Sequence, residues 1–138
     1  MRKRASLKKR KNSVKVVCRL YAHFLRYSRS PHVQQDTRLA YAFDAGYVLL
    51  LDAARRAGCA TPVEHSDPEV VRAGTRALGV PSVDERLALE LLRWADFDRF
   101  GKIRPAPCSL RKAMFWAKRI KLRYACRLRR GIKSRKRL

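Results

Sequence analysis

Acidic residues are missing from both ends of this 138-residue chain. Residues 1–30 carry 11 Lys and Arg, and residues 101–138 carry 15, without one Asp or Glu in either segment. Residues 31–100 hold the other 8 Lys and Arg together with all 11 acids, so the formal net charge of +23 comes from the two ends. Because like charges repel one another in a compact protein, this segregation favours an anionic partner that neutralises them.

Long apolar runs are missing as well. No stretch approaches the roughly 20 apolar residues of a membrane-spanning helix, and the N-terminus lacks the compact apolar core of a secretory signal. We therefore expect no membrane partner and a cytoplasmic or nucleoid-associated protein. The first 35 residues, which are acid-free and rich in Arg and Ser, leave import into an organelle as an alternative.

The cysteines lack the close spacing of a zinc site: they are Cys18, Cys59, Cys108 and Cys126, with no CxxC pair and no histidine beside them. We expect four reduced thiols, with Cys18 and Cys126 helping to pack helices, and no metal ion or cofactor. A contact between Cys18 and Cys126 that brings the two ends together stays open.

Catalytic signatures are missing too. The chain has no Gly-rich phosphate loop of a common spacing, and its three histidines have no evident partners for a nucleophilic triad. Two carboxylate pairs, Asp44 with Asp52 and Asp96 with Asp98, have arginine neighbours, and we interpret them as members of intrahelical ion pairs. The sequence names no reaction, so we expect a protein that is not an enzyme.

What the sequence does contain is helical periodicity. Sustained alternation and Asn-Gly or Asp-Gly hairpin turns are absent, whereas apolar residues recur every three or four positions. This pattern predicts five helices, at about 14–27, 36–57, 68–78, 83–100 and 110–130. We therefore predict an all-α fold, a single antiparallel bundle of about five helices over residues 12–131.

Capping residues support these boundaries. Ser13 fits an N-cap of the first helix, and Asp67 before a proline fits the start of the third. Ser82 opens a capping box with Glu85, and Ser109 fits the N-cap of the last helix. Beyond the bundle, residues 1–11 carry seven positive charges and residues 132–138 are similarly basic, so we expect two disordered basic arms there.

These features predict a nucleic-acid-binding bundle, non-enzymatic, that contacts the phosphate backbone of RNA in preference to DNA. Arginine outnumbers lysine in the last segment, which favours bidentate phosphate contacts. A protein surface that serves only solubility normally mixes the two signs of charge, whereas both ends of this chain carry positive charge alone. The residues expected to contact nucleic acid are Arg2, Lys3, Arg4, Lys8, Lys9, Arg10, Lys11, Lys15, Arg19, Arg111, Lys112, Lys118, Arg119, Arg123, Arg127, Arg129, Arg130, Lys133, Arg135, Lys136 and Arg137.

Two further interpretations stay open. The first alternative is that the chain is a structural protein of a ribonucleoprotein particle such as a ribosome. Apolar residues on a second face of the fourth helix, Leu89 and Phe97, indicate a buried element, a homodimer or assembly within a larger complex.

Aromatic residues are interleaved with the cations of the last helix. Tyr124 continues the apolar stripe and is expected in the core. Phe115 and Trp116 are adjacent, so they cannot both face inward, and one of them is a candidate for stacking on a nucleic-acid base.

The middle of the chain, about residues 36–122, resembles a group of bacterial helical bundles related to HEPN domains, which handle nucleotides or RNA and are often encoded in toxin–antitoxin and defence loci. The resemblance is carried by the stretch from Arg38 to Tyr47, by Asp67-Pro68, by Leu91-Leu92-Arg93-Trp94-Ala95 and by the turn before Ser109-Leu110.

Catalytic proteins of the HEPN group share an Arg followed four to six residues later by His at the start of a late helix. The match here is Arg26 with His32, which falls where the first helix ends and contains the helix-breaking Pro31. The resemblance therefore implies a non-catalytic bundle, and an HEPN-type ribonuclease or toxin–antitoxin component that uses Arg26 and His32 is the alternative.

Overall fold

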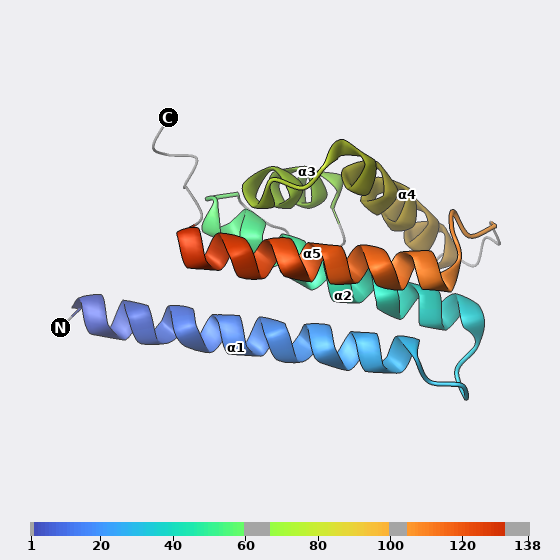
Figure 1. Ribbon diagram of the computed structural model, residues 1–138, viewed down its shortest axis with the longest axis horizontal. Helices are drawn as coiled ribbons and strands as arrows, with labels where there is room; N and C mark the ends of the chain where they lie inside the picture. Colours follow the sequence, from blue (N-terminus) through green and yellow to red (C-terminus); the bar gives the residue numbers. More distant parts are fainter. Residues whose placement is uncertain (1, 60–66, 100–104, 132–138) are drawn as a thin grey trace.

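The computed structural model describes residues 2–59, 67–99 and 105–131, with side chains for 13–59, 67–96 and 105–131. The helices in this part of the chain are α1 (Arg2–Ser28), α2 (Gln35–Arg56), α3 (Pro68–Leu78), α4 (Ser82–Arg99) and α5 (Leu110–Arg130) (Figure 1). The described ranges contain no strand, and the predicted all-α helical bundle is confirmed.

Helix α2 is the centre of the fold, because α1, α3, α4 and α5 all pack against it. Its buried residues, such as Leu39, Phe43 and Leu49, lie on several sides of the helix, as expected for a helix in the protein interior. Helix α1 runs antiparallel to α2, whereas α5 runs in the same direction as α2 (Figure 1). The α3–α4 pair lies on the other side of α5 from α1. Because α2 and α5 run in the same direction, this pair brings the chain back from the end of α2 to the start of α5.

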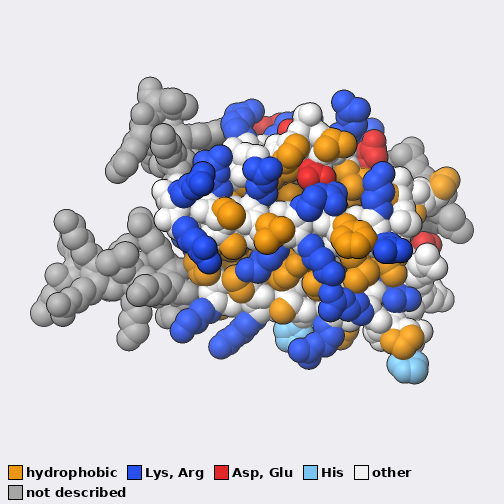
Figure 2. Space-filling model, in the orientation of Figure 1, with side chains coloured by type: hydrophobic (Ala, Val, Ile, Leu, Met, Phe, Trp, Pro, Cys, Tyr) orange, Lys and Arg blue, Asp and Glu red, His pale blue; other side chains and the backbone are white. Residues whose placement is uncertain are grey.

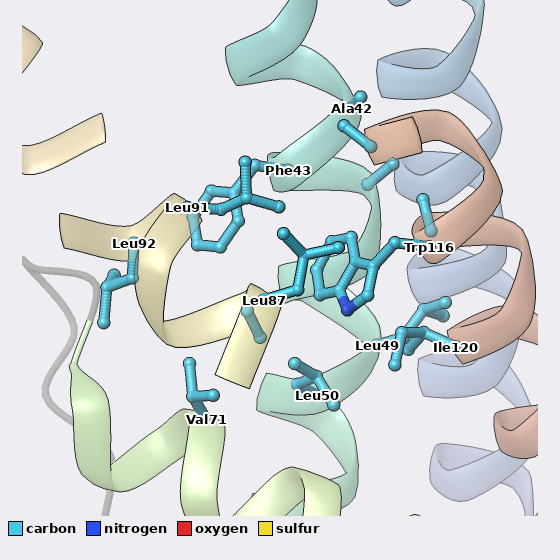
Figure 3. Close-up of a cluster of buried hydrophobic side chains, with 14 of the residues drawn as sticks. Ala42, Phe43, Leu49, Leu50, Val71, Leu87, Leu91, Leu92, Trp116 and Ile120 are labelled. Carbon is cyan, nitrogen blue, oxygen red and sulfur yellow. The ribbon is translucent and has the colours of Figure 1, made fainter. Parts of the chain in front are cut away.

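The core is built around Trp116 of α5, which is 0% exposed. Its ring stacks on Phe43 of α2, with the ring centroids 6.0 Å apart, and it lies among leucines of α4 such as Leu87 (Figure 3). A Cβ atom at Gly46 would collide with this ring, so glycine lets the indole lie directly on α2. Trp116 therefore fixes how α5 is rotated against the rest of the bundle.

Local capping chemistry explains two of the four helix starts that have a predicted cap. The Asp67 carboxylate accepts a hydrogen bond from the Glu69 amide at 2.8 Å, and the Ser109 hydroxyl accepts one from the Lys112 amide at 3.1 Å. Helix α4 differs from the prediction, because it begins at Ser82 itself and its first bonded amides donate to the carbonyl of Pro81. Ser82 is thus inside the helix and is not its N-cap.

Helix α1 also differs from the prediction. We expected residues 1–11 to be a disordered arm and Ser13 to be an N-cap, but the backbone is helical from Arg2 onward. Lys, Arg, Ala and Leu are good helix formers, and neither Pro nor Gly separates them from the amphipathic part of the helix. Ser13 lies inside α1, where its hydroxyl donates to Asp52 of α2 at 3.4 Å. The expected arm at 132–138 lies outside the described residues.

Candidate nucleic-acid interface

The two acid-free helices, α1 and α5, lie side by side against α2 (Figure 1). Lys121 of α5 connects them: its Nζ donates to the Cys18 thiol of α1 at 3.6 Å and lies 5.9 Å from the centroid of the Tyr21 ring. Figure 2 shows Lys and Arg side chains spread over this side of the molecule, with little acidic surface among them. The basic ends of the sequence therefore meet on one side of the fold.

On α1, three exposed cations form a stripe: Lys15, Arg19 and Arg26, at i, i+4 and i+11. Cys18, which Lys121 contacts, lies at i+3 from Lys15, so the stripe borders the side of α1 that faces α5. Toward the N-terminus, the positions at 11, 7 and 4 residues before Lys15 also lie within α1 and continue the same helical periodicity, and they hold Arg4, Lys8 and Lys11.

Helix α5 carries most of its cations in two stripes. The outward stripe consists of Arg111, Lys118 and Arg129, which are exposed at i, i+7 and i+18 on the side that points away from the core residues Ala113 and Ile120. We call these three residues, together with Lys15, Arg19 and Arg26 of α1, the basic face. The second stripe borders α4 and consists of Lys112, Arg119, Arg123 and Arg130, all exposed.

One member of the second stripe already has an acidic partner. The Arg119 guanidinium donates to the Asp84 carboxylate at 2.9 and 3.1 Å, and Asp84 is only 7% exposed. The backbone carbonyl of Asp84 also accepts a hydrogen bond from the Trp116 indole at 3.1 Å. Asp84 therefore holds the start of α4 against α5, and Arg119 has a structural role besides the phosphate contact that we predicted for it.

The other predicted contact residues fall into three groups. Arg127 is half-buried beside Gly79, whereas the remaining predicted cations of α5 are exposed. The second group comprises the predicted residues from Arg2 to Lys11, whose backbone is part of α1. The last group lies outside the described residues: Lys133, Arg135, Lys136 and Arg137. Arg26, which the sequence suggested only as an HEPN-type residue, joins the basic face because it continues the helical spacing of Arg19.

A buried polar network fixes the positions of α1 and α5 on α2. The Tyr124 hydroxyl of α5 donates to Asp52 of α2 at 2.6 Å, and the Arg56 guanidinium donates to the same carboxylate at 2.7 Å. Ser13 of α1 reaches its other oxygen. Burial, followed by the hydrogen bond to Asp52, raises the pKa of Tyr124 well above its ordinary value. The predicted pairing of Asp52 within α2 is confirmed, but the same carboxylate also joins three helices.

The two adjacent aromatic residues of α5 have opposite environments. Trp116 is buried, whereas Phe115 is 46% exposed. The Arg111 guanidinium lies 5.6 Å from the centroid of the Phe115 ring, and the Lys118 ammonium lies 5.7 Å from it. Of the two candidates for base stacking, only Phe115 is accessible.

A surface hollow of about 450 Å³ lies between α4 and α5. Lys112, Arg86 and Arg119 line it together with Asp84 and Glu90, so its charge is mixed. In the part of the chain that the structure describes, no three His, Cys, Asp or Glu side chains gather as a metal site would require.

The four cysteines differ in how far they are buried. All four cysteines are free thiols; Cys18 packs against the core as expected, but Cys126 is exposed and does not pack helices. Position 126 turns outward because the nearby Tyr124 takes the inward place on α5.

The two residues of the HEPN-like pair are both exposed. Arg26 lies in the last turn of α1, and His32 lies in the turn that follows.

Among the described residues, no helix combines the length and the apolar character needed to cross a membrane. No family model, no curated protein and no solved structure matches this chain.

Proposed function

We propose that the protein binds nucleic acid through the basic face and that it is not an enzyme. The observation that carries this proposal is the meeting of α1 and α5, the two helices without acids, on one side of α2. Rows of Lys and Arg that are fixed on neighbouring helices match a phosphate backbone, and each contact releases a condensed counterion. Of the two nucleic acids, we propose RNA as the partner in preference to DNA.

A polyanion fits the basic face better than a small anionic ligand does. The cations of the basic face extend along both helices, and α5 alone is roughly 30 Å long at 1.5 Å per residue. A row of that length exceeds a single phosphate group but suits several consecutive phosphates. The same row also suits a protein that assembles into a ribonucleoprotein particle.

Two double variants with equal changes in charge test the proposal. Arg19→Glu with Arg129→Glu alters the basic face, whereas Arg76→Glu with Arg93→Glu alters exposed arginines of α3 and α4. Fluorescence anisotropy with labelled single-stranded RNA would measure the affinity of each protein. We expect the first pair to weaken binding about ten-fold and the second to change it about two-fold or less.

Equal effects of the two pairs would contradict a localised interface, because net charge alone would then explain the binding. A wild-type protein without measurable affinity for RNA or DNA at low salt would contradict the proposal altogether. Circular dichroism of both variants checks that the helical content is unchanged.

A further inference from the structure

Phe115 is an apolar ring held in the middle of the outward stripe of α5. The neighbouring Trp116 is 0% exposed, stacks on Phe43 and donates its N–H to the Asp84 carbonyl. These contacts fix the rotation of α5, so Phe115 cannot turn into the core without removing Trp116 from it. The exposure of Phe115 is therefore a consequence of how the core is packed.

The surroundings of Phe115 combine the two chemistries that a single strand requires. Arg111 and Lys118 lie on the ring at 5.6 and 5.7 Å from its centroid, one turn before it and one turn after it. Leu122 follows on the same stripe and is 67% exposed. Aromatic rings stack on bases, while nearby cations hold the phosphates on either side.

We infer that the outward stripe of α5 binds single-stranded nucleic acid, with an unpaired base stacked on Phe115 and adjacent phosphates on Arg111 and Lys118. This inference rests on the proposed function and adds the class of ligand. In a duplex the base faces are already stacked on one another, so only an unpaired base can cover the ring. The positive charge of the stripe excludes a cationic partner.

Three substitutions of Phe115 separate stacking from general apolar contact. Phe115→Leu keeps apolar area and a good helix former but removes the ring, whereas Phe115→Trp keeps a ring that can stack. Phe115→Ala gives the full truncation. Val83→Ala is the matched control, because Val83 is an exposed apolar residue of α4, outside the basic face. The probes are oligouridylate, a duplex with the same number of phosphates, heparin and phosphatidylserine vesicles.

We expect Phe115→Leu and Phe115→Ala to bind oligouridylate at least about five-fold more weakly than the wild type, and Phe115→Trp to bind it about equally. Affinity for the duplex and for heparin should change less than about two-fold in all variants, close to the size of the effect of Val83→Ala.

Oligouridylate binding that is unchanged in Phe115→Leu and Phe115→Ala would overturn the inference while leaving the proposed function intact. A uniform loss for every polyanion would also overturn it, because Phe115 would then support the fold or the phosphate contacts. Vesicle binding that depends on Phe115, with oligouridylate binding unaffected, would assign the stripe to a lipid surface instead. If the wild type binds neither nucleic acid, the proposed function itself fails.

Discussion

Removal of one hydroxyl group, by Tyr124→Phe, tests whether the Asp52 network holds the two basic helices in place. The Tyr124 hydroxyl donates to Asp52 at 2.6 Å, and Tyr124 is 0% exposed. A hydrogen bond to a charged group contributes about 1.5–3 kcal/mol to stability. Because Arg56 and Ser13 still bond to the carboxylate in the variant, we expect a loss of about 2 kcal/mol.

Thermal unfolding and urea denaturation would measure this loss. With an unfolding entropy of about 2.1 cal/mol/K per residue, a domain of this size should melt roughly 7 °C lower. Tyr27→Phe is the matched control, because Tyr27 is 46% exposed and its ring remains in the variant. A change in melting temperature no larger than that of Tyr27→Phe would refute the role of this network.

The raised pKa of the Tyr124 hydroxyl predicts that the stability of the fold depends on pH. The pKa of Tyr124 is raised in the folded protein by burial and by Asp52, so folding favours the neutral phenol. The stabilisation is complete below the pKa of an unfolded tyrosine, about 10, and is lost as the pH rises above that value. The stability difference between the wild type and Tyr124→Phe should therefore shrink above about pH 10. A difference that stayed constant or grew there would contradict this sign.

Three other substitutions test the packing, each by urea denaturation. Gly74→Ala should cost about 3 kcal/mol, because its Cβ would collide with the backbone carbonyl of Leu50; a loss below about 1 kcal/mol would refute that close approach. Asp84→Ala should cost about 1–2 kcal/mol, since Arg119 is half-exposed, and should exceed the effect of Glu85→Ala. Ser109→Ala should cost about 1 kcal/mol through loss of the cap, and an unchanged stability would contradict the capping role.

Local signals in the sequence predicted much of the fold. Asp67 and Ser109 act within their own helix starts, so their neighbours in the sequence suffice to identify them. The first helix was predicted to begin too late, because the density of charge from Arg2 to Lys11 was interpreted as disorder, although those residues favour helix. Ser13 directly precedes the periodic apolar residues, a position that fits an N-cap, whereas its observed partner Asp52 lies 39 residues away in the sequence.

Contacts between distant residues could not be predicted in the same way. Tyr124 and Asp52 are 72 residues apart, and Arg119 and Asp84 are 35 apart, so no periodicity relates them. The sequence showed that only one of Phe115 and Trp116 can face inward, but their surroundings decide which one does. The meeting of α1 and α5 likewise depends on how both helices pack against α2, which no local pattern reveals.

The most direct test of the central claim is the dependence of nucleic-acid affinity on salt concentration. Each neutralised phosphate of a single strand contributes about −0.7 to the slope of log K against log salt. If each cation of the basic face neutralises one phosphate, we expect a slope of about −4 for single-stranded RNA. A slope near zero between low and moderate salt would contradict binding through the basic face.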